Sequence, residues 1–249
     1  MEKISAFLIT LNEEQKILSA LESVAFCDEI VVVDSGSDDD TVTLCENFGA
    51  RVIKHGWEGY AKQKQFAMMQ CQYDWCLNID ADEVVSVELR ESILHALSFA
   101  NDIVAYEIVG RNQFLGSMVP VSMRLEYHVR LFRKSRVSYD SEKLVHESVV
   151  ISGKKTRLTG HINHMAKESI AIFQKDLDKY STLRAVEKQR CSKRSSLLKL
   201  FFVFPITFIK KYFIQRAVFF GARGLILATM ESYYAFLKEA KLWELNSGD

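Results

Sequence analysis

Three carboxylates, Asp80, Asp82 and Glu83, follow directly after an apolar run in the stretch LNIDADE. Like charges this close repel one another and resist burial, so a positive group is expected among them. Asp80 and Asp82 stand two residues apart at the end of a predicted strand, which lets both side chains lean toward one point outside the sheet. A hard divalent cation, Mg²⁺ or Mn²⁺, would bind carboxylate oxygens there and diphosphate oxygens on its other side. The pattern therefore predicts metal-assisted departure of a nucleoside diphosphate, with a solvated loop or helix start as the alternative.

Four short apolar runs precede or include this cluster, and polar loops and helix-like patterns alternate with them. The runs cover residues 4–10, 29–34, 51–55 and 74–80. They are mostly too continuously apolar for a sheet with one wet face, so they are expected to form the parallel centre of an α/β sheet.

Helices are expected between these strands. Ile17, Leu18 and Leu21 repeat at helical spacing behind Asn12, which has the residue type of an N-cap. Ser37 and Asp40 resemble a capping box before a helix at 41–48. Two further helices are predicted at 60–70 and 87–99.

The pattern changes after residue 100. Alternating segments at 103–110, 125–134, 144–151 and 156–164 predict antiparallel strands that close one edge of the sheet. From residue 166 to 249 the pattern is helical. We therefore expect one α/β domain over 1–165 and a helical C-terminal extension over 166–249 that packs on it and that could contact a membrane, without an independent second domain.

The segment 197–209, LLKLFFVFPITFI, is the most apolar in the chain. At 13 residues it is shorter than the ~20 that a membrane-spanning helix needs. Two interpretations remain: a helix that lies on an anionic membrane surface, or a helix that packs inside the protein. Bases dominate around it, with Glu187 as the single acid among Arg184, Lys188, Arg190, Lys193, Arg194, Lys199, Lys210, Lys211, Arg216 and Arg223.

Overall charge and cysteine usage narrow the class of protein. Lys plus Arg and Asp plus Glu number 32 each, so no whole-chain field favours nucleic acid. The five cysteines form no C-x-x-C pair, which suits neither a disulfide framework nor a zinc site and favours a reducing cytoplasm. The N-terminal apolar stretch is too short for a signal peptide.

Ligands of open parallel sheets bind beyond the carboxyl ends of the strands, which would bring four polar clusters together. These clusters cover residues 10–14, 34–40, 57–64 and 80–83. Their carboxylates and amides suit ribose hydroxyls and a base edge. Since neither G-x-G-x-x-G nor G-x-x-x-x-G-K-[ST] occurs, a nucleotide would bind without a dinucleotide loop or a P-loop.

Seven motifs occur in an order and spacing that resemble family 2 glycosyltransferases with the GT-A fold. They are ITLNEE, EIVVVDSGSDDDT, WEGYAKQKQFA, DWCLNIDADE, VRLFRK, VHE and GHINH. The resemblance covers about residues 3 to 240. It implies a Rossmann-like, nucleotide-sugar-binding sheet with C-terminal helices, and it is closest to bacterial enzymes that add glucose to the heptose of the lipopolysaccharide inner core.

The resemblance also implies site residues. A metal would be held at Asp82, and His164 would complete metal or diphosphate binding, with His161 and His146 as competitors. Asp80 would face the ribose or the metal. The residues implied to line the nucleoside pocket are Thr10, Asn12, Glu14, Asp34 and Ser35.

Inversion at a sugar carbon requires a base opposite the leaving diphosphate. Glu147 in VHE matches the family's candidate, whereas an exposed strand acid paired with a base is the alternative. Cations for the diphosphate are expected from Lys62 or Lys64 and from Arg130 or Arg133.

The resulting hypothesis is an inverting transferase that uses UDP-glucose, Mg²⁺ or Mn²⁺ and a lipid-linked acceptor, located as a peripheral protein on the cytoplasmic face of the bacterial inner membrane. Three alternatives remain. They are a GT-A transferase for another glycolipid or capsule acceptor, a nucleotide-sugar-binding scaffold without turnover, and a metal-dependent nucleotidyltransferase, although the last lacks a Gly-rich basic N-terminal loop.

Overall fold

The computed structural model describes residues 2–99, 102–120, 122–123, 126–139, 149–164 and 169–247. The chain divides into two compact units, the first formed by Met1–Arg111 with Glu126–Met165 and the second by Asn112–Leu125 with Ala166–Asp249. The segment 112–125, expected with residues 1–165, belongs to the helical unit because Phe114 packs its ring against Phe173 at 5.7 Å.

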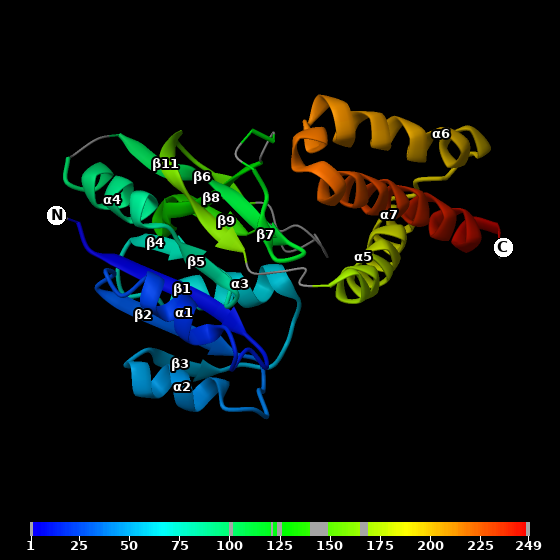
Figure 1. Cartoon of the computed structure of the whole chain (residues 1–249). Helices are drawn as coiled ribbons and strands as arrows, with labels where there is room; N and C mark the ends of the chain where they lie inside the picture. Colours follow the sequence, from blue (N-terminus) through cyan, green and yellow to red (C-terminus); the bar gives the residue numbers. More distant parts are fainter. Residues whose placement is uncertain are drawn as a thin grey trace. The chain divides into compact units, whose positions relative to one another are not determined.

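The centre of the first unit is a sheet whose first four strands are parallel. β1 (Ile4–Thr10), β2 (Glu29–Asp34), β3 (Arg51–Lys54) and β4 (Trp75–Asn78) lie in the order β3-β2-β1-β4 (Figure 1). This order and the intervening helices confirm the predicted α/β class with a parallel centre.

Antiparallel strands extend the sheet beyond β4. β8 (Tyr127–Arg133), β6 (Ile103–Phe114), β11 (Lys154–His164) and β5 (Glu83–Val85) follow in that order. β7 (Ser117–Met118) pairs with β6, and β9 (Val137–Tyr139) pairs with β10 (Val149–Ile151) in a separate small sheet. β5 was not predicted, because its three residues are too few to show a periodic pattern.

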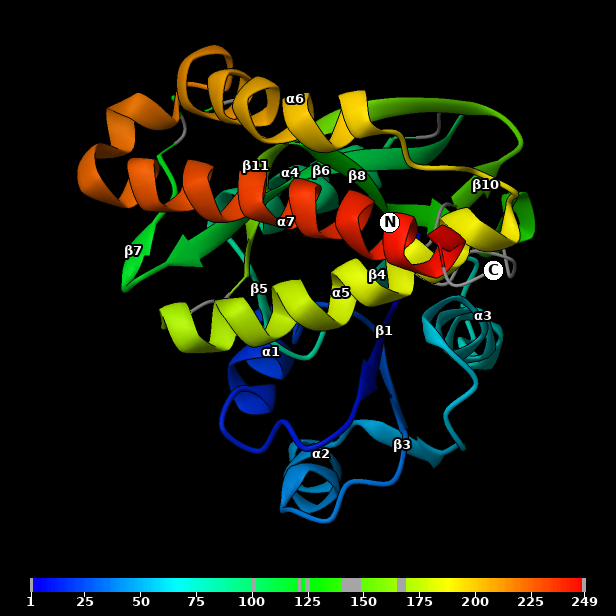
Figure 2. The same cartoon turned by 90° about the vertical axis from the view of Figure 1, so that its right-hand side faces the viewer.

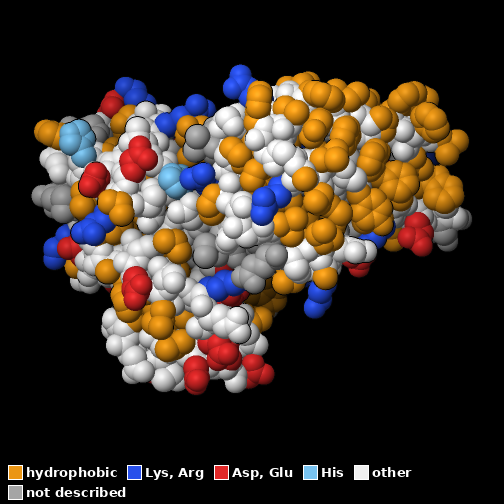
Figure 3. All heavy atoms as spheres, in the orientation of Figure 1, with side chains coloured by type: hydrophobic (Ala, Val, Ile, Leu, Met, Phe, Trp, Pro, Cys, Tyr) orange, Lys and Arg blue, Asp and Glu red, His pale blue; other side chains and the backbone are white. Residues whose placement is uncertain are grey.

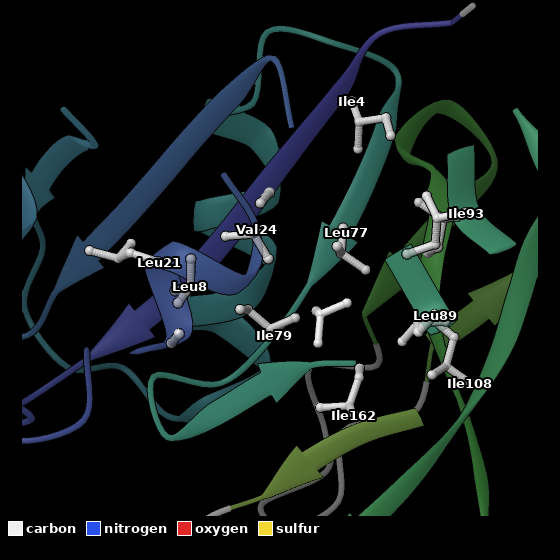
Figure 4. Packing of buried hydrophobic residues seen from close by; sticks show 14 of the residues in the cluster. Ile4, Leu8, Leu21, Val24, Leu77, Ile79, Leu89, Ile93, Ile108 and Ile162 are labelled. Carbon is white, nitrogen blue, oxygen red and sulfur yellow. The ribbon is translucent and has the colours of Figure 1, made fainter. Parts of the chain in front are cut away.

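Both faces of the parallel strands are buried, which explains their unbroken apolar sequences. On one face Ala6, Leu8 and Val32 join a cluster covered by α1 (Ile17–Ser23), α2 (Thr41–Phe48) and α4 (Val87–Ala96). On the other face Phe7, Val31 and Val33 pack with α3 (Tyr60–Gln70). In Figure 4, Leu8, Leu77 and Ile79 point from the strands and the loop after β4 into the first cluster.

The two predicted N-caps are wrong. Asn12 has a left-handed backbone (φ 55°), and α1 begins five residues later, at Ile17, without a side-chain cap. Ser37 donates its hydroxyl to Asp34, and Asp40 gives α2 no side-chain cap. The side chains of Asn12 and Ser37 instead form hydrogen bonds within and between the loops after β1 and β2. The fourth helix ends at Ala96 rather than at residue 99.

The second unit is helical over most of its described residues. It contains α5 (Ile170–Arg190), α6 (Leu197–Ile209), the π turn η2 (Lys210–Ile214), the 3₁₀ turn η3 (Ala217–Phe220) and α7 (Gly221–Ser247), and α7 packs against both α5 and α6 (Figure 2). The buried residues of α7 include the small Gly224, Ala228 and Ser232. Gly224 also lets α7 lie against η3, since a Cβ there would lie 1.8 Å from the carbonyl oxygen of Ala217. Within the described part of the chain, no helix combines the length and apolarity that crossing a membrane requires.

Gly160 allows β11 to lie against α4, and we predict that Gly160→Ala destabilises the protein. Its φ is +85°, and a Cβ would lie 2.3 Å from the backbone nitrogen of Leu89. Strain and the contact together should reduce the free energy of unfolding by about 2–4 kcal/mol in urea denaturation. Gly110→Ala in β6 is the control, since its Cβ would meet nothing within 4 Å. Equal losses in both variants would contradict this account.

Candidate functional site

The carboxyl ends of the parallel strands lie at one edge of the sheet. Thr10, at the end of β1, lies beside Asp34 at the end of β2, and Asp34 lies beside Lys54 at the end of β3. The Thr10 hydroxyl is buried and has no hydrogen-bond partner among the residues that the structure describes. An unpaired buried hydroxyl at this edge is a feature that a bound ligand would satisfy.

Hydrogen bonds join the loop after β1 to the loop after β2. The N–H of Asn12 donates to Ser37 Oγ at 2.9 Å, and the N–H of Asp38 donates to Asn12 Oδ1 at 3.0 Å. The N–H of Asp40 donates to Glu14 Oε2 at 3.2 Å. Asn12 and Glu14, both predicted to line a nucleoside pocket, therefore hold the two loops together.

Asp34 and Ser35 are fixed by their surroundings. Asp34 is buried, and its Oδ2 accepts from the N–H groups of Gly36 at 2.9 Å and Ser37 at 3.0 Å. Ser35 Oγ accepts from Nε2 of Gln63 on α3 at 3.1 Å, and this glutamine is itself buried. This hydrogen bond joins the polar cluster at 57–64 to the cluster at 34–40.

Two cations lie among the carboxylates that follow β4. Lys64 Nζ is 2.8 Å from Asp80 Oδ1, and the guanidinium of Arg130 lies 3.5 Å from Asp80 Oδ2 and 2.7 Å from Glu83 Oε1. Glu83 Oε2 also accepts from the N–H of Asp80 at 2.9 Å. Lys64 of α3 and Arg130 of β8 are the positive groups that were expected among the three carboxylates.

The register of β8 explains the position of Arg130. Leu77 of β4 lies opposite Leu131 of antiparallel β8, so the preceding residue, Arg130, lies beside the end of β4. Arg133 lies at the other end, opposite Trp75, and pairs with Asp74 and Glu2. The structure therefore brings Arg130, and not Arg133, to the acidic cluster.

These cations determine how the acids ionise. Burial by itself would raise the pKa of Asp80, but Lys64 and Arg130 hold it well below its usual range. Burial and the charge of Asp80 raise the pKa of Glu83, while Arg130 opposes them. Asp80 is consequently a charged anchor that is neutralised from two sides.

Asp82 and His164 form a second pair at this edge. Asp82 Oδ2 lies 3.0 Å from His164 Nε2, because the pairing of β5 with β11 places His164 opposite Glu83. Burial alone would lower the pKa of His164, but the Asp82 carboxylate and the other nearby acids raise it above its ordinary value. A carboxylate oxygen and an imidazole nitrogen are both donors that Mn²⁺ accepts.

The contact of 3.0 Å between Asp82 Oδ2 and His164 Nε2 is a hydrogen bond, and an ion bound by both groups would replace it. Over the described ranges, no group of three or more His, Cys, Asp or Glu side chains is placed to hold a metal ion. Any ion bound by this pair would therefore need further ligands.

The other candidates lie elsewhere or are not described. The N–H of His161 donates to Ser86 Oγ at the start of α4, and burial and the charge of Arg111 lower its pKa. Lys62 is 57% exposed and lies 3.9 Å from Glu58, whereas Lys64 is only 7% exposed. His146 and Glu147 lie outside the described residues.

Three residues of this site were not assigned a role from the sequence. They are Glu13, whose pKa is raised by burial and by Asp82, Glu83, which binds Arg130, and Gln63, which binds Ser35. Glu13 and Glu83 stand inside the acidic motifs, but nothing in their spacing separates them from solvated neighbours. Gln63 lies in the predicted polar cluster 57–64, but its sequence position does not show that it contacts Ser35.

Comparison with known proteins gives a consistent result. Residues 5–180 match the family described as Glycosyl transferase family 2. The lipopolysaccharide core biosynthesis glycosyltransferase LpsC of Rhizobium meliloti is 37% identical over 97% of this chain and 92% of its own length. An uncharacterized glycosyltransferase of Rickettsia typhi is 35% identical over 99% of this chain and 88% of its own length.

A solved structure is also similar in part. It is the glucosyl-3-phosphoglycerate synthase of Mycobacterium tuberculosis in complex with Mn²⁺, UDP and glucosyl-3-phosphoglycerate, with 25% identity, a TM-score of 0.38, and coverage of 46% of this chain and 45% of that one. At this score the likeness carries no conclusion about the present chain.

We predict that Arg130→Met destabilises the protein because it leaves the buried Glu83 carboxylate without its cation. The free energy of unfolding should fall by about 3 kcal/mol. Arg157→Met is the matched control: Arg157 pairs with Glu107 at 3.3 Å but is exposed, so its loss should cost less than about 1 kcal/mol. Adding Glu83→Gln should recover part of the loss in a double-mutant cycle. Strictly additive effects would show that the two groups do not interact.

Proposed function

The chain belongs to glycosyltransferase family 2, and we propose that this glycosyltransferase is an inverting, metal-dependent enzyme that moves glucose from UDP-glucose to a heptose of the lipopolysaccharide inner core. The observation that carries the proposal is the group of Lys64, Arg130, Asp82 and His164 at the carboxyl edge of the parallel strands. Its two cations and its carboxylate–imidazole pair support the proposal, because nucleotides bind at this edge of α/β sheets.

The diphosphate would lie against Lys64 and Arg130. Both cations are already oriented by Asp80, and Arg130 also by Glu83, so little side-chain entropy is lost when a second anion arrives. Preorganised cations next to the bond that breaks stabilise the charge that develops on the leaving group. Asp80 contributes by holding them.

Asp82 and His164 would hold the divalent ion, Mn²⁺ or Mg²⁺, with donor diphosphate oxygens and water as further ligands. The imidazole nitrogen favours Mn²⁺ over Mg²⁺. When bound, the ion supplies a Lewis acid that neutralises charge on the departing diphosphate. Because His164 must be unprotonated to bind a metal, its raised pKa predicts weaker metal affinity in acid.

The nucleoside would bind over the loops that follow β1 and β2. Thr10 offers its unpaired hydroxyl, and Ser35 offers a hydroxyl oriented by Gln63. Asn12, Glu14 and Asp34 keep these loops in place and remain candidates for contacts with the ribose and base.

The transfer itself needs a base for the acceptor. In the proposed step, Glu147 removes the proton of an acceptor hydroxyl whose oxygen attacks the anomeric carbon. A new carbon–oxygen bond forms as the bond to the diphosphate breaks, and UDP leaves with the electron pair. Attack from the face opposite the leaving group inverts the anomeric configuration.

The acceptor class rests on the relative from Rhizobium meliloti, whose name assigns it to lipopolysaccharide core biosynthesis. A lipid-linked acceptor would place the enzyme on the cytoplasmic face of the inner membrane as a peripheral protein. Another glycolipid or capsule precursor is the alternative acceptor, and it would give turnover without heptose.

We predict that purified protein releases UDP from UDP-glucose only when a heptose-containing core acceptor and Mn²⁺ or Mg²⁺ are both present. Excess EDTA should abolish release, and Asp82→Ala should reduce kcat/KM at least about 100-fold because the metal loses its carboxylate ligand. The control is Asp102→Asn, which removes a surface acid 68% exposed and should have little effect. Full activity in Asp82→Ala or in EDTA would refute the metal-dependent mechanism.

The structure also distinguishes two lysines on the same helix. We predict that Lys64→Gln lowers kcat by about 10²-fold or more, because a preorganised cation at the leaving group is lost. Lys62→Gln, two residues away and exposed, should stay within about threefold of wild type. Steady-state kinetics with saturating donor measure both. Equal losses would show that the diphosphate reaches the outer side of α3.

A further inference from the structure

Helix α6 carries an apolar face that the protein leaves uncovered. None of its residues is buried, although it is the most apolar segment of the chain, and Leu197 and Phe201 are 75% and 77% exposed. The exposed large apolar residues of α6, η2 and η3 are Leu197, Leu198, Phe201, Phe202, Ile206, Ile209, Phe213, Ile214, Val218 and Phe219. Figure 3 shows hydrophobic side chains gathered over the region of α6 and α7.

The exposed residues of α6 form one continuous surface. At about 100° per residue, Leu197, Leu198, Phe201, Phe202, Ile206 and Ile209 fall within roughly half of the helix circumference. The opposite half of the helix contains Leu200, Val203 and Phe204, which are partly covered, as expected for the side of α6 that packs against α7. The apolar face is therefore separate from the packing face, and nothing in the described fold uses it.

Exposed bases flank this face in the sequence. No Asp or Glu occurs between residues 188 and 230. The exposed bases in this interval are Arg190, Lys193, Arg194, Lys199, Lys210, Arg216 and Arg223. On the wheel, Lys199 and Lys210 fall roughly 20–40° beyond Ile206, at one border of the apolar arc. Lysines in that position can extend their charged ends to lipid headgroups while their stems cover apolar surface.

We propose that the exposed face of α6, η2 and η3 docks on an anionic phospholipid bilayer, with α6 parallel to the membrane plane. A contiguous exposed apolar face marks an interaction surface. Apolar side chains on one side and flanking bases are the features of helices that lie in the interface of anionic membranes. At 13 residues α6 is too short to cross the bilayer instead.

Charge also decides between a membrane and a second copy of the chain. A symmetric dimer through this face would bring the same set of bases together, with no acid from residues 188–230 to offset them. Anionic headgroups offset them directly. The proposal agrees with a lipid-linked acceptor but does not rest on it, because vesicle binding requires neither donor nor acceptor.

The test is flotation of the full-length protein with vesicles in metal-free buffer without UDP-glucose. The wild type should float with vesicles that contain phosphatidylglycerol, bind phosphatidylcholine vesicles at least tenfold more weakly, and be released by high salt. Phe201→Glu/Phe213→Glu should lower binding at least tenfold by placing charge at the apolar face. Lys193→Gln/Arg194→Gln should weaken binding to the anionic vesicles alone.

The controls use exposed positions in the first unit. Val87→Glu alters a residue 74% exposed at the start of α4, and Lys154→Gln/Lys155→Gln removes two adjacent exposed bases of β11. Both should bind vesicles as wild type does. Wild-type binding by the Phe201→Glu/Phe213→Glu variant would overturn the proposal. So would a dimer in sedimentation velocity that this variant converts to monomer, since the face would then belong to a second copy.

Discussion

The site depends on one electrostatic constraint, the concentration of negative charge at the end of β4. Three acids within four residues would repel one another and resist burial unless cations balanced them. Lys64 and Arg130 do so, one from a helix on one face of the sheet and one from the neighbouring antiparallel strand. These ion pairs tie α3, β5, β8 and the loop after β4 together.

This arrangement gives neighbouring acids different roles. Asp80 is held between two cations, and Glu83 is buried against one of them, so both are engaged by the protein itself. Asp82, between them in sequence, lies instead against His164 from β11. The pairing of β5 with β11 causes this separation, and Gly160 allows β11 to approach α4 closely on the way to His164.

The helical unit meets a different constraint. Both α5 and α6 pack against α7, which buries the small residues Gly224, Ala228 and Ser232. No residue of α6 is buried, so its apolar side chains stay exposed on one face. Exposed Leu, Ile and Phe side chains order water at a cost in free energy that burial elsewhere would remove. In the proposed docking, lipid acyl chains would cover these apolar side chains, and anionic headgroups would offset the neighbouring bases.

The sequence by itself determined the α/β class, the bounds of β1, β2 and α3, and the motifs of the site, because periodicity and composition are local properties. The tertiary structure decided which candidates meet. Lys64 and Arg130, rather than Lys62 and Arg133, contact the acidic cluster, and His164 lies beside Asp82. Asn12 joins two loops instead of capping a helix, and α6 is exposed. Strand register joins Asp82 to His164, which lies 82 positions further along the chain, and no local pattern encodes that distance.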